Sequence, residues 1–393
     1  MDNDTTVVIT IRGECVPTWD VSFEMRVDVG SHRVVAAVAR AHALAEVIRG
    51  IPVTPLVRSH FDSLNILRAV RGTTGIEGGD LSETEAAEVI AAADDEPVLP
   101  PGRARMEQEA RNAHNAMRAI HDELTKNPGR QLDEALIREI HRLTTDNIDY
   151  AHNQPGHYRS HAVSVGDYTP PRTHDEIEAL MQEFLRWFRE DEPSGWDGIV
   201  RAIAAHFYLV SIHPFGDGNG RTARAVESFL LYRAGVNAFG FYSLANFYYR
   251  ERDRYIQELT DARFDHGGDL TPFIVFGLEG LVAELEFVHR EVLDQVKVTA
   301  YRDYAREMLD KYPRLSRERR ARMLELVHDL AHLHLPGAFV GVPGMQVAAA
   351  LYRGVGDRTF RRDLKILTEL ELVVRDENDL VANIDVMDRF IPA

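Results

Sequence analysis

The chain has 393 residues, and its 62 acidic residues outnumber its 45 lysines and arginines, which leaves a formal net charge of −17. This acidic balance disfavours a protein that coats nucleic acid or an anionic membrane over its whole surface, although one small basic face would be hidden in the average. The single cysteine, Cys15, excludes a disulfide within the chain and a cysteine-rich zinc site.

Length and hydropathy predict a cytoplasmic protein of two or three domains, since a domain holds about 150 residues on average. The first residues, MDNDTTVVIT, carry acids where a signal peptide needs basic side chains. No uncharged apolar stretch approaches the roughly 20 residues that a membrane span requires. We therefore expect no membrane partner.

A small β element is expected near the N-terminus. Residues 21–29, VSFEMRVDV, alternate apolar and polar side chains at a period of two, which is typical of a strand. Residues 7–11, VVITI, form a second apolar run with high strand propensity. Together the two segments predict a two-stranded element whose function the sequence does not reveal.

Helices are expected to fill the rest of a first part, residues 1–98. From Ser31 the apolar spacing becomes helical and continues to the glycine-rich stretch at 71–80, where we expect the helix to end. A further alanine-rich helix covers 82–93, and the breaker VLPPG follows it. That breaker marks the boundary with the next part.

The second part, residues 99–300, consists mainly of amphipathic or buried helix. The segments 199–211 and 221–234 are nearly all apolar, which predicts two core helices. One interruption, 161–169, begins with the alternating HAVSV and continues into a Gly-Asp turn, which predicts a short β-hairpin. The expected fold class is therefore mainly all-α.

The loop between the two core helices reads HPFGDGNGRTAR and has the composition of an anion site. Gly216, Gly218 and Gly220 free its backbone to turn several N–H groups toward one point, and the next helix adds its N-terminal donors and positive dipole end. Arg221 and Arg224 are three residues apart on the first helical turn and can hold phosphate oxygens with bidentate forks. Phosphate is the expected anion.

Two further residues of the loop indicate chemistry. Asp217 lies among the glycines and would suit an oxygen-ligated Mg²⁺ that bridges phosphates. His213 at the loop entrance is its only side chain that titrates near neutrality, so it is the natural general base. Each of these residues alone is usually structural, but burying two arginines and an aspartate without a charged ligand would be costly. Together they favour phosphoryl or nucleotidyl transfer.

The same loop matches, at every defined position, the signature HxFx(D/E)GNGRxxR of the Fic family, and the chain resembles that family over roughly residues 103–290, including GHYRSHAVSV and YTPP before the motif. The resemblance implies an all-α Fic core and an enzyme that transfers AMP from ATP to a protein Ser, Thr or Tyr hydroxyl, with release of pyrophosphate. Members with Lys at position 220 resemble Doc toxins, which transfer the γ-phosphate, whereas Gly220 resembles the AMP-transferring branch.

The resemblance also implies roles within the motif. His213 would deprotonate the target hydroxyl, and Asp217 would hold Mg²⁺ on the α- and β-phosphates of ATP. Asn219 and the loop amides would form the anion hole, and Arg221 would contact the phosphates. Phe215 would anchor the loop in the core.

Two segments outside the motif take part in the resemblance. The hairpin 161–169 resembles the family's flap, which would align a target protein by backbone hydrogen bonds, although an ordinary hairpin covering the core is the alternative. Tyr255 in RDRYIQEL is expected near an adenine pocket. Ile256 replaces a second aromatic often seen there, and aromatic residues at helical spacing are more often core.

The segment TTGIEG at 73–78 fits the pattern (S/T)xxxE(G/N), with Thr73 and Glu77 at its defined positions, and resembles the inhibitory helix of Fic proteins. We expect this helix near 60–78. Glu77 would pair with Arg224 and occupy the guanidinium that the γ-phosphate of ATP needs. The same glutamate could instead position a water that removes AMP, so the direction of the reaction stays open.

The third part, residues 313–393, is expected to end in a helix-turn-helix followed by a wing. The pattern reads a helix MQVAAALY, a turn RGVGD, a helix TFRRDLKILTELEL, and two short strands, LVVRD and LVANI. This order resembles the winged-helix domain that many bacterial Fic proteins carry. A winged helix serves DNA binding, protein contact or dimerisation, and a homodimer is therefore one of the states we consider.

The second helix of this part predicts a basic face in an acidic chain. Five basic residues against Asp357 and Asp363 leave a local net charge of +3 between positions 345 and 365. The five are Arg353, Arg358, Arg361, Arg362 and Lys365. DNA contact would use the last four. The competing hypothesis for the whole chain is accordingly a DNA-binding transcriptional regulator whose Fic core senses nucleotide or is modified by it.

Overall fold

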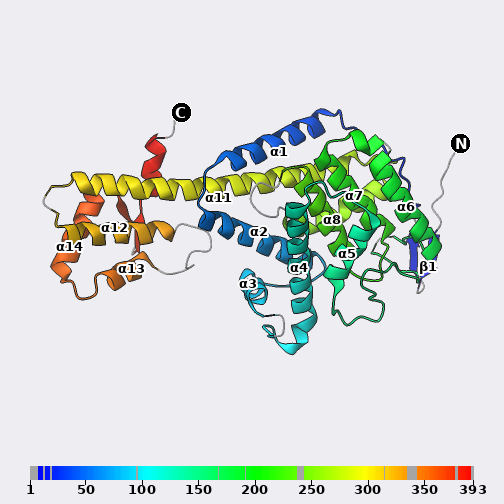
Figure 1. Cartoon of the computed structure of the whole chain (residues 1–393), viewed down its shortest axis with the longest axis horizontal. Helices are drawn as coiled ribbons and strands as arrows, with labels where there is room; N and C mark the ends of the chain where they lie inside the picture. The colour runs from blue at the N-terminus through cyan, green and yellow to red at the C-terminus, as the bar shows by residue number, and fades with distance from the viewer. Residues whose placement is uncertain are drawn as a thin grey trace. The chain divides into compact units, whose positions relative to one another are not determined.

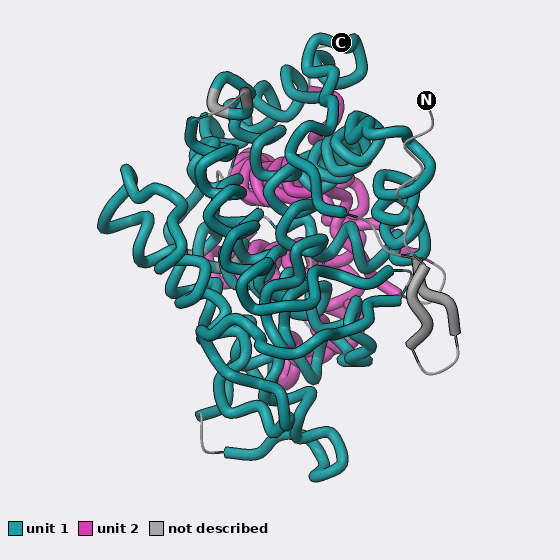
Figure 2. The backbone as a smooth tube through the Cα atoms, turned by 90° about the vertical axis from the view of Figure 1, so that its right-hand side faces the viewer, with its two compact units in different colours: residues 1–286 teal, residues 287–393 magenta. Residues whose placement is uncertain are grey.

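The computed structural model falls into two compact units, residues 1–286 and 287–393, which Figure 2 colours separately. The residues that it describes are 8–11, 14–17, 20–93, 96–166, 168–190, 192–236, 243–313, 315–333, 343–376 and 379–390. The boundary between the units falls within one long helix, α11 (Thr271–Lys311). The division into three parts made from the sequence stays a prediction.

Helices dominate the first unit, which confirms the expected mainly all-α fold (Figure 1). They are α1 His32–Gly50, α2 Pro55–Ile76, α3 Glu83–Ala91, α4 Ala104–Lys126, α5 Glu134–Thr145, α6 His174–Glu190, α7 Gly198–Ile212, α8 Asn219–Arg233, α9 Ala245–Arg250, α10 Arg252–Phe264 and the first part of α11, with 3-10 turns η1 Pro101–Arg103 and η2 Glu192–Gly195. None of the helices in the described ranges combines the length and the apolar character needed to cross a bilayer.

The N-terminal β element exists, but one of its two strands was predicted in the wrong place. Strand β1 (Val8–Ile11) pairs in antiparallel fashion with β2 (Glu14–Pro17). The segment 21–29 is not a strand of this sheet. Its period-two pattern nevertheless corresponds to real alternation in burial, with odd-numbered residues facing inward from 21 to 29.

Packing rather than sheet pairing explains that alternation. An extended chain turns successive side chains to opposite sides whether or not it has a strand partner. Phe23 lies against the rings of Tyr208 and Trp187, at centroid distances of 4.8 and 5.6 Å. Arg26 makes the segment's one described β-bridge, because its N–H donates to the carbonyl of Gly268 and its carbonyl accepts from the N–H of Leu270.

The two core helices predicted on either side of the motif are confirmed as α7 and α8. Every residue of α7 except its first and Arg201 is buried, as expected for a helix that is apolar on nearly all faces. Asp197 caps α7 by accepting a hydrogen bond from the N–H of Ile199 at 2.8 Å. At the far end of α8, Gly235 has φ 74°, the left-handed conformation in which glycine ends a helix.

Helix α2 ends at Ile76, inside the glycine-rich stretch 71–80 where the sequence predicts a helix end. Its glycines allow close packing rather than ending the helix. A Cβ on Gly72 would lie 2.6 Å from the backbone of Ala245, and a Cβ on Gly75 would lie 2.4 Å from the ring of Tyr249. Both neighbours belong to α9, so α2 approaches α9 more closely than a side chain would permit. This packing sets where the C-terminal end of α2 lies.

The predicted hairpin at 161–169 is short in the structure. Val165 and Tyr168 form a single antiparallel bridge, with backbone N–H to carbonyl distances of 3.0 and 2.9 Å in the two directions. Asp167, half of the predicted turn, lies outside the described residues. The preceding residues, 161–164, belong to no helix or strand and are at least partly exposed.

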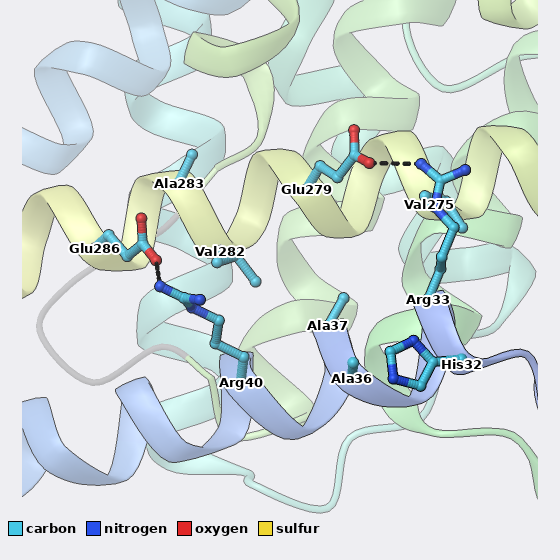
Figure 3. Close-up of a pocket in the computed structure, with 10 residues that line it drawn as sticks. All are labelled: His32, Arg33, Ala36, Ala37, Arg40, Val275, Glu279, Val282, Ala283 and Glu286. Carbon is cyan, nitrogen blue, oxygen red and sulfur yellow. Dashed lines mark hydrogen bonds and ion pairs between the residues drawn. The ribbon is translucent and has the colours of Figure 1, made fainter.

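Helix α1 lies along the first part of α11, and a shallow pocket between them is drawn in Figure 3. Arg33 pairs with Glu279 at 2.8 Å, and Arg40 pairs with Glu286. These ion pairs are exposed, and such pairs contribute only about 0 to 1 kcal/mol each. They align two helices without defining a binding site.

The second unit has its own apolar core. Its elements are the end of α11, α12 Arg317–His332, α13 Gly344–Leu351, α14 Asp357–Glu369, β3 Val373–Asp376, β4 Asp379–Ala382 and η3 Ile384–Phe390. Strands β3 and β4 pair in antiparallel fashion, with Val373 opposite Ala382. Leu326, Leu330 and Leu367 are among the fully buried side chains of the core. The element order is the one the sequence predicts, and the winged-helix assignment stays a prediction.

Candidate functional site

The motif loop makes a sharp turn between α7 and α8. His213 ends α7 with φ 50°, and Gly218 precedes α8 with φ 70°. A positive φ is costly for a histidine and readily adopted by glycine, so the loop holds His213 in a conformation that an unconstrained chain avoids. Such strain is typical of functional sites.

The contacts of His213 determine which ring nitrogen is free. Nδ1 lies 3.3 Å from the carbonyl oxygen of Val210, and a carbonyl can only accept, so Nδ1 carries the proton. Nε2 therefore keeps its lone pair. Burial lowers the pKa of His213 to about 4, which the hydrogen bond to Val210 only partly offsets. The ring is neutral at pH 7 and is able to accept a proton.

Arg159 connects the hairpin to the motif loop, a role that sequence reasoning did not assign. Its Nε donates to the carbonyl of His213 at 2.8 Å, its backbone N–H donates to the carbonyl of Pro214 at 2.9 Å, and its Nη1 donates to the carbonyl of His161 at 2.8 Å. Burial lowers its pKa to about 10, which still leaves it charged. Arg159 lies in the segment GHYRSH. Its position between a glycine and the hairpin is the sequence feature that could have identified it as a functional residue.

Phe215 and Asn219 stabilise the loop from inside. The Phe215 ring is buried and stacks on the ring of His141, with centroids 3.7 Å apart. Asn219 accepts from the N–H of Phe215 and donates to its carbonyl, both at 2.8 Å. The amide of Asn219 is thus engaged with the loop backbone, whereas the resemblance assigns it to an anion hole.

His141 is a second residue that the sequence did not single out. Its Nδ1 accepts from the N–H of Gly156 at 2.9 Å, and its Nε2 donates to the carbonyl of Asp217 at 3.0 Å. These partners allow only the neutral tautomer with the proton on Nε2. Burial lowers the pKa of His141 to about 4. His141 therefore positions the backbone of Asp217.

Two motif glycines are required by close approach. A Cβ on Gly216 would lie 2.1 Å from the carbonyl oxygen of His152, and a Cβ on Gly218 would lie 2.4 Å from Cγ2 of Thr145. A side chain at Gly216 would require a backbone shift, and one at Gly218 would require Thr145 to move and would be strained by the positive φ. The glycines thus serve packing as well as the backbone freedom predicted for them.

Asp217 and Arg221 belong to a network of four charged side chains. Oδ2 of Asp217 accepts from Arg221 at 3.1 Å and from Arg105 at 3.2 Å. Glu109 lies 3.0 Å from Arg105 and 3.4 Å from Arg221. Arg105 and Glu109 are on α4, far from the motif in sequence, and no local pattern identifies them. The structure places Asp217 between two guanidinium groups.

Arg224 and Glu77 meet in the structure, although 147 positions separate them in sequence. Nη2 of Arg224 donates to Oε1 of Glu77 at 2.7 Å and to the carbonyl of Thr73 at 3.1 Å, and Nε donates to the Thr73 hydroxyl at 2.8 Å. The Glu77 side chain is 41% exposed, and the charge and hydrogen bond of Arg224 hold its pKa below the usual value despite the partial loss of hydration. The pair is therefore ionised at neutral pH.

Gly220 lies directly beneath this ion pair. A Cβ at Gly220 would lie 2.4 Å from Oε1 of Glu77 and 3.0 Å from Nη1 of Arg224. Any larger residue would displace the Glu77 carboxylate. The identity of residue 220 is thus coupled to whether Glu77 can reach Arg224.

Tyr255 lies in the core beneath the motif. Its side chain is buried, its hydroxyl lies 2.9 Å from Nε2 of His206, and its ring stacks on Tyr248 with centroids 4.7 Å apart. Burial raises its pKa to about 12, so the hydroxyl stays protonated at neutral pH. An adenine contact for Tyr255 stays a prediction.

The basic side chains predicted on α14 are exposed. Arg358, Arg361, Arg362 and Lys365 all face solvent, as does Arg353 before the helix. Asp363 is 0% exposed and accepts from Nε of Arg319 at 2.9 Å and from the Tyr352 hydroxyl at 3.1 Å. Because Asp363 faces inward, the exposed surface is more basic than the sequence count indicates.

Comparison with known proteins finds similarity to one family over part of the chain. The Fic/DOC family model matches residues 131–231. The protein adenylyltransferase Fic of Drosophila ananassae is 36% identical over 140 residues, which cover 36% of this chain and 26% of that protein. The Nematostella vectensis protein of the same name is 38% identical over 141 residues, 30% of its length. The chain thus spans about a quarter of the length of the curated relatives it matches.

Solved structures show the same fold. A Fic family protein from Desulfovibrio desulfuricans G20 aligns with a TM-score of 0.53 at 21% identity, covering 89% of this chain and 95% of that one. A Fic domain containing signaling protein from Bacteroides thetaiotaomicron aligns with a TM-score of 0.51 at 19% identity, covering 66% of this chain and 97% of that one. At these identities the likeness concerns the fold alone.

Proposed function

We propose that this chain is a protein adenylyltransferase, a proposal supported by the match of the Fic/DOC family model to residues 131–231. It transfers AMP from ATP to a Ser, Thr or Tyr hydroxyl of a protein. One observation carries the proposal: the complete motif loop combines a neutral histidine, whose Nε2 keeps its lone pair, with two buried arginines in the first two turns of α8. A proton acceptor and a phosphate site within one loop fit nucleotidyl transfer.

The reaction exchanges one phosphorus–oxygen bond for another and transfers one proton. The hydroxyl oxygen of the target attacks the α-phosphorus of ATP while the bond from that phosphorus to the oxygen leading to the β-phosphate breaks, and pyrophosphate leaves. Nε2 of His213 takes the hydroxyl proton. The low pKa of His213 keeps Nε2 unprotonated at neutral pH. The N-terminal amides of α8, with Arg221 and Arg224, bind the phosphates.

Mg²⁺ is the cofactor that this chemistry implies, and Asp217 is the residue that would hold it. Within the described ranges no three metal-ligating side chains converge, and Mg²⁺ is commonly bound by one or two carboxylates together with substrate phosphates. Oδ2 of Asp217 accepts from the two arginines, while its Oδ1 accepts no hydrogen bond from a described residue. One carboxylate oxygen thus fits a cation, which would neutralise phosphate charge.

We propose that Glu77 and Thr73 inhibit the enzyme by occupying Arg224. The contacts of 2.7 and 2.8 Å engage guanidinium nitrogens that a γ-phosphate would need. ATP then binds only in a pose that does not react. The same carboxylate is also suitably placed to orient a water that removes AMP, so the measurement below tests both directions.

The target protein docks along the hairpin 161–169 in this proposal. Residues 161–164 are at least partly exposed and pair with no described strand, and the described hairpin is only one bridge wide, so its backbone could pair with a strand from another protein. Backbone pairing demands little of the target sequence. Arg159 holds the base of this segment against the loop that carries His213.

Intact mass after incubation with Mg²⁺ and ATP tests the proposal. We expect Glu77→Gly to gain AMP units, and wild type to gain far fewer. The double variant Glu77→Gly with His213→Ala is the matched control, and we expect it to gain none, because loss of a general base costs about 100- to 10,000-fold. Removal of AMP is tested separately, by incubating AMP-modified Glu77→Gly protein with wild type.

Two results would contradict the proposal. Equal incorporation in wild type and Glu77→Gly rules out inhibition by Glu77. An AMP gain that persists at the same rate in the double variant rules out His213 as the base.

A second candidate function is DNA binding by α14, favoured by the exposure of its basic side chains and the inward position of Asp363. Counterion release makes such binding fall steeply with salt. Retention of the protein on DNA at low salt, lost in the variant Arg361→Ala with Arg362→Ala, is the expected result. Absence of retention by wild type at low salt would remove this candidate.

A further inference from the structure

One carboxylate on α11, that of Glu284, holds α2 and α9 together. Its side chain is only 7% exposed, and the proposed reaction does not use it. Oε2 accepts a hydrogen bond from Nη2 of Arg68 on α2 at 2.8 Å. Oε1 accepts from Nδ2 of Asn246 at 3.2 Å and lies 2.9 Å from Nη2 of Arg250, both on α9. A single buried carboxylate thus joins the helix that carries Thr73 and Glu77 to the helix on which it packs.

Arg68 lies on the face of α2 that packs on α9. Positions 68, 72 and 75 share one face of a helix, because they follow the spacing i, i+4, i+7. Gly72 and Gly75 bring the α2 backbone close to α9, where a Cβ on either would collide with Ala245 or Tyr249. A glycine face has no side chains that form ridges against the neighbouring helix, so it does little to fix how α2 slides or rotates. The directional contacts of Arg68 can fix this.

A second directional contact holds the C-terminal end of α2. Nε of Arg252 on α10 donates to the carbonyl of Ile76, the last residue of α2, at 3.1 Å. Arg252 is exposed, whereas the Arg68 side chain is only 13% exposed and its partner Glu284 is 7% exposed. Breaking a buried ion pair costs far more than breaking an exposed contact. The placement of Glu77, which caps α2, therefore depends mainly on the pair formed by Arg68 and Glu284.

We propose that Glu284 is a positioning residue for the inhibitory Glu77. By pairing with Arg68, it keeps α2 in the place from which Glu77 reaches Arg224. If the carboxylate is lost, α2 in this place leaves a nearly buried guanidinium without that anion, whereas a displaced α2 exposes the guanidinium to water. Loss of Glu284 therefore favours displacement of α2 and frees Arg224. This inference rests on the proposed function, in which Glu77 inhibits by occupying Arg224.

A purely structural role for Glu284 predicts a different outcome. In that case its loss would destabilise the first unit as a whole, and AMP transfer would change by the same factor whether or not Glu77 is present. A positioning residue acts through Glu77, so its loss should matter only when Glu77 is there. Glu286 offers a matched control, because it lies two residues further along α11 and pairs with Arg40 on α1 (Figure 3).

The experiment compares Glu284→Gln and Glu286→Gln by intact mass after incubation with Mg²⁺ and ATP, each with and without Glu77→Gly. With Glu77 present, we expect Glu284→Gln to gain AMP about tenfold faster than wild type, the scale of a hydrogen bond to a charged group. In the Glu77→Gly background it should stay within about twofold of its parent, since changes that act through one contact are not additive. Glu286→Gln should match its parent in both backgrounds.

Two results of this comparison would overturn the proposal when Glu77→Gly itself transfers AMP. One is a rate in Glu284→Gln that equals that of wild type. The other is a change in rate by the same factor with and without Glu77.

A second measurement needs no nucleotide and separates this inference from the proposed function. Hydrogen exchange followed by mass spectrometry reports the protection of backbone N–H groups in peptides from α2 and α7. We expect residues 68–77 to exchange about tenfold faster in Glu284→Gln than in wild type, with α7 unchanged. Equal protection of α2 in the two proteins, or equal acceleration in α7, would overturn the proposal. If Glu77→Gly transfers no AMP while α2 shows the expected change, the proposed function fails and the positioning of α2 by Glu284 stands.

Arg68→Lys is a second variant that tests the same pair if Glu284→Gln does not fold. It keeps the positive charge but replaces the planar guanidinium with an ammonium group, so the pair should weaken rather than break. We expect a smaller change in the same direction in both measurements. Failure of both variants to fold, shown by circular dichroism, would mean that the fold itself needs the pair and would overturn the proposal.

Discussion

The motif loop and helix α14 both carry several charged side chains on a helical turn, but they hold those charges in opposite ways. Arg221 and Arg224 are almost completely buried, and each makes a defined ion pair. Arg361 and Arg362 are exposed. The carboxylate nearest Arg361 is that of Asp357, 3.6 Å away and almost fully exposed itself.

This difference teaches that burial and pairing, rather than the number of charges, indicate where a specific ligand binds. Desolvated guanidinium groups are held in one geometry and lose much when a partner is removed. Exposed guanidinium groups contribute an electrostatic potential that salt screens. Replacing any one of them changes the free energy of unfolding little. The predictions below test this distinction.

Asp363 is the buried charge among the exposed charged side chains of α14. Its replacement should therefore lower stability more than replacement of an exposed arginine of the same helix. Asp363→Ala removes the partner of Arg319 and of the Tyr352 hydroxyl. We expect a loss of about 3 kcal/mol in the free energy of unfolding of the second unit, as for other broken buried pairs. Chemical denaturation measures it. A loss below about 0.5 kcal/mol, the range of ordinary surface substitutions, would contradict the prediction.

Gly216→Ala tests the packing of the motif loop. The added Cβ would lie 2.1 Å from the carbonyl oxygen of His152, so the backbone must shift, at a cost of about 1 to 3 kcal/mol. In the Glu77→Gly background this shift should also reduce AMP transfer. Gly102→Ala is the matched control, since a Cβ there meets no atom within 4 Å. Equal stability and activity in the two variants would show that the loop tolerates a side chain.

The buried histidines predict how stability depends on pH. The pKa of His141 is about 4 in the folded protein, against 6.5 for the free group, so between these values the unfolded chain binds a proton that the folded one does not. Stability should therefore fall as the pH falls from 6.5 toward 4, with a slope of up to about 1.4 kcal/mol per pH unit from this group. His141→Gln should show a shallower slope in urea denaturation between these pH values. An identical slope would contradict the prediction.

Arg362→Ala should have the smallest effect. Its side chain is exposed, so the free energy of unfolding should change by less than about 0.5 kcal/mol. AMP transfer by the Glu77→Gly background should not change, because α14 lies in the second unit. Thermal denaturation measures the change in stability, and the mass assay measures AMP transfer. A large loss of stability would mean that the exposed face is part of the packing.

Local patterns predicted much of the helical fold and of the loop. Apolar spacing located α7 and α8 to within two residues, because a helix apolar on all faces has few alternatives to burial. Local patterns did not reveal that Gly72 and Gly75 allow close contact between α2 and α9. The period-two pattern failed at 21–29, where an extended segment alternates in burial without joining the two-stranded sheet.

The sequence by itself determined the helices, the motif loop between two of them and the residue types within it, since these depend on neighbours along the chain. Only the tertiary structure decided which partners the charges have. Glu77 reaches Arg224 because α2 packs on α9, and Arg105 reaches Asp217 from α4. The tautomers of His213 and His141 depend on carbonyl and amide groups that folding brings to their rings. The physical reason is that burial and the orientation of a hydrogen bond are properties of the packed molecule and leave no periodic trace in the sequence.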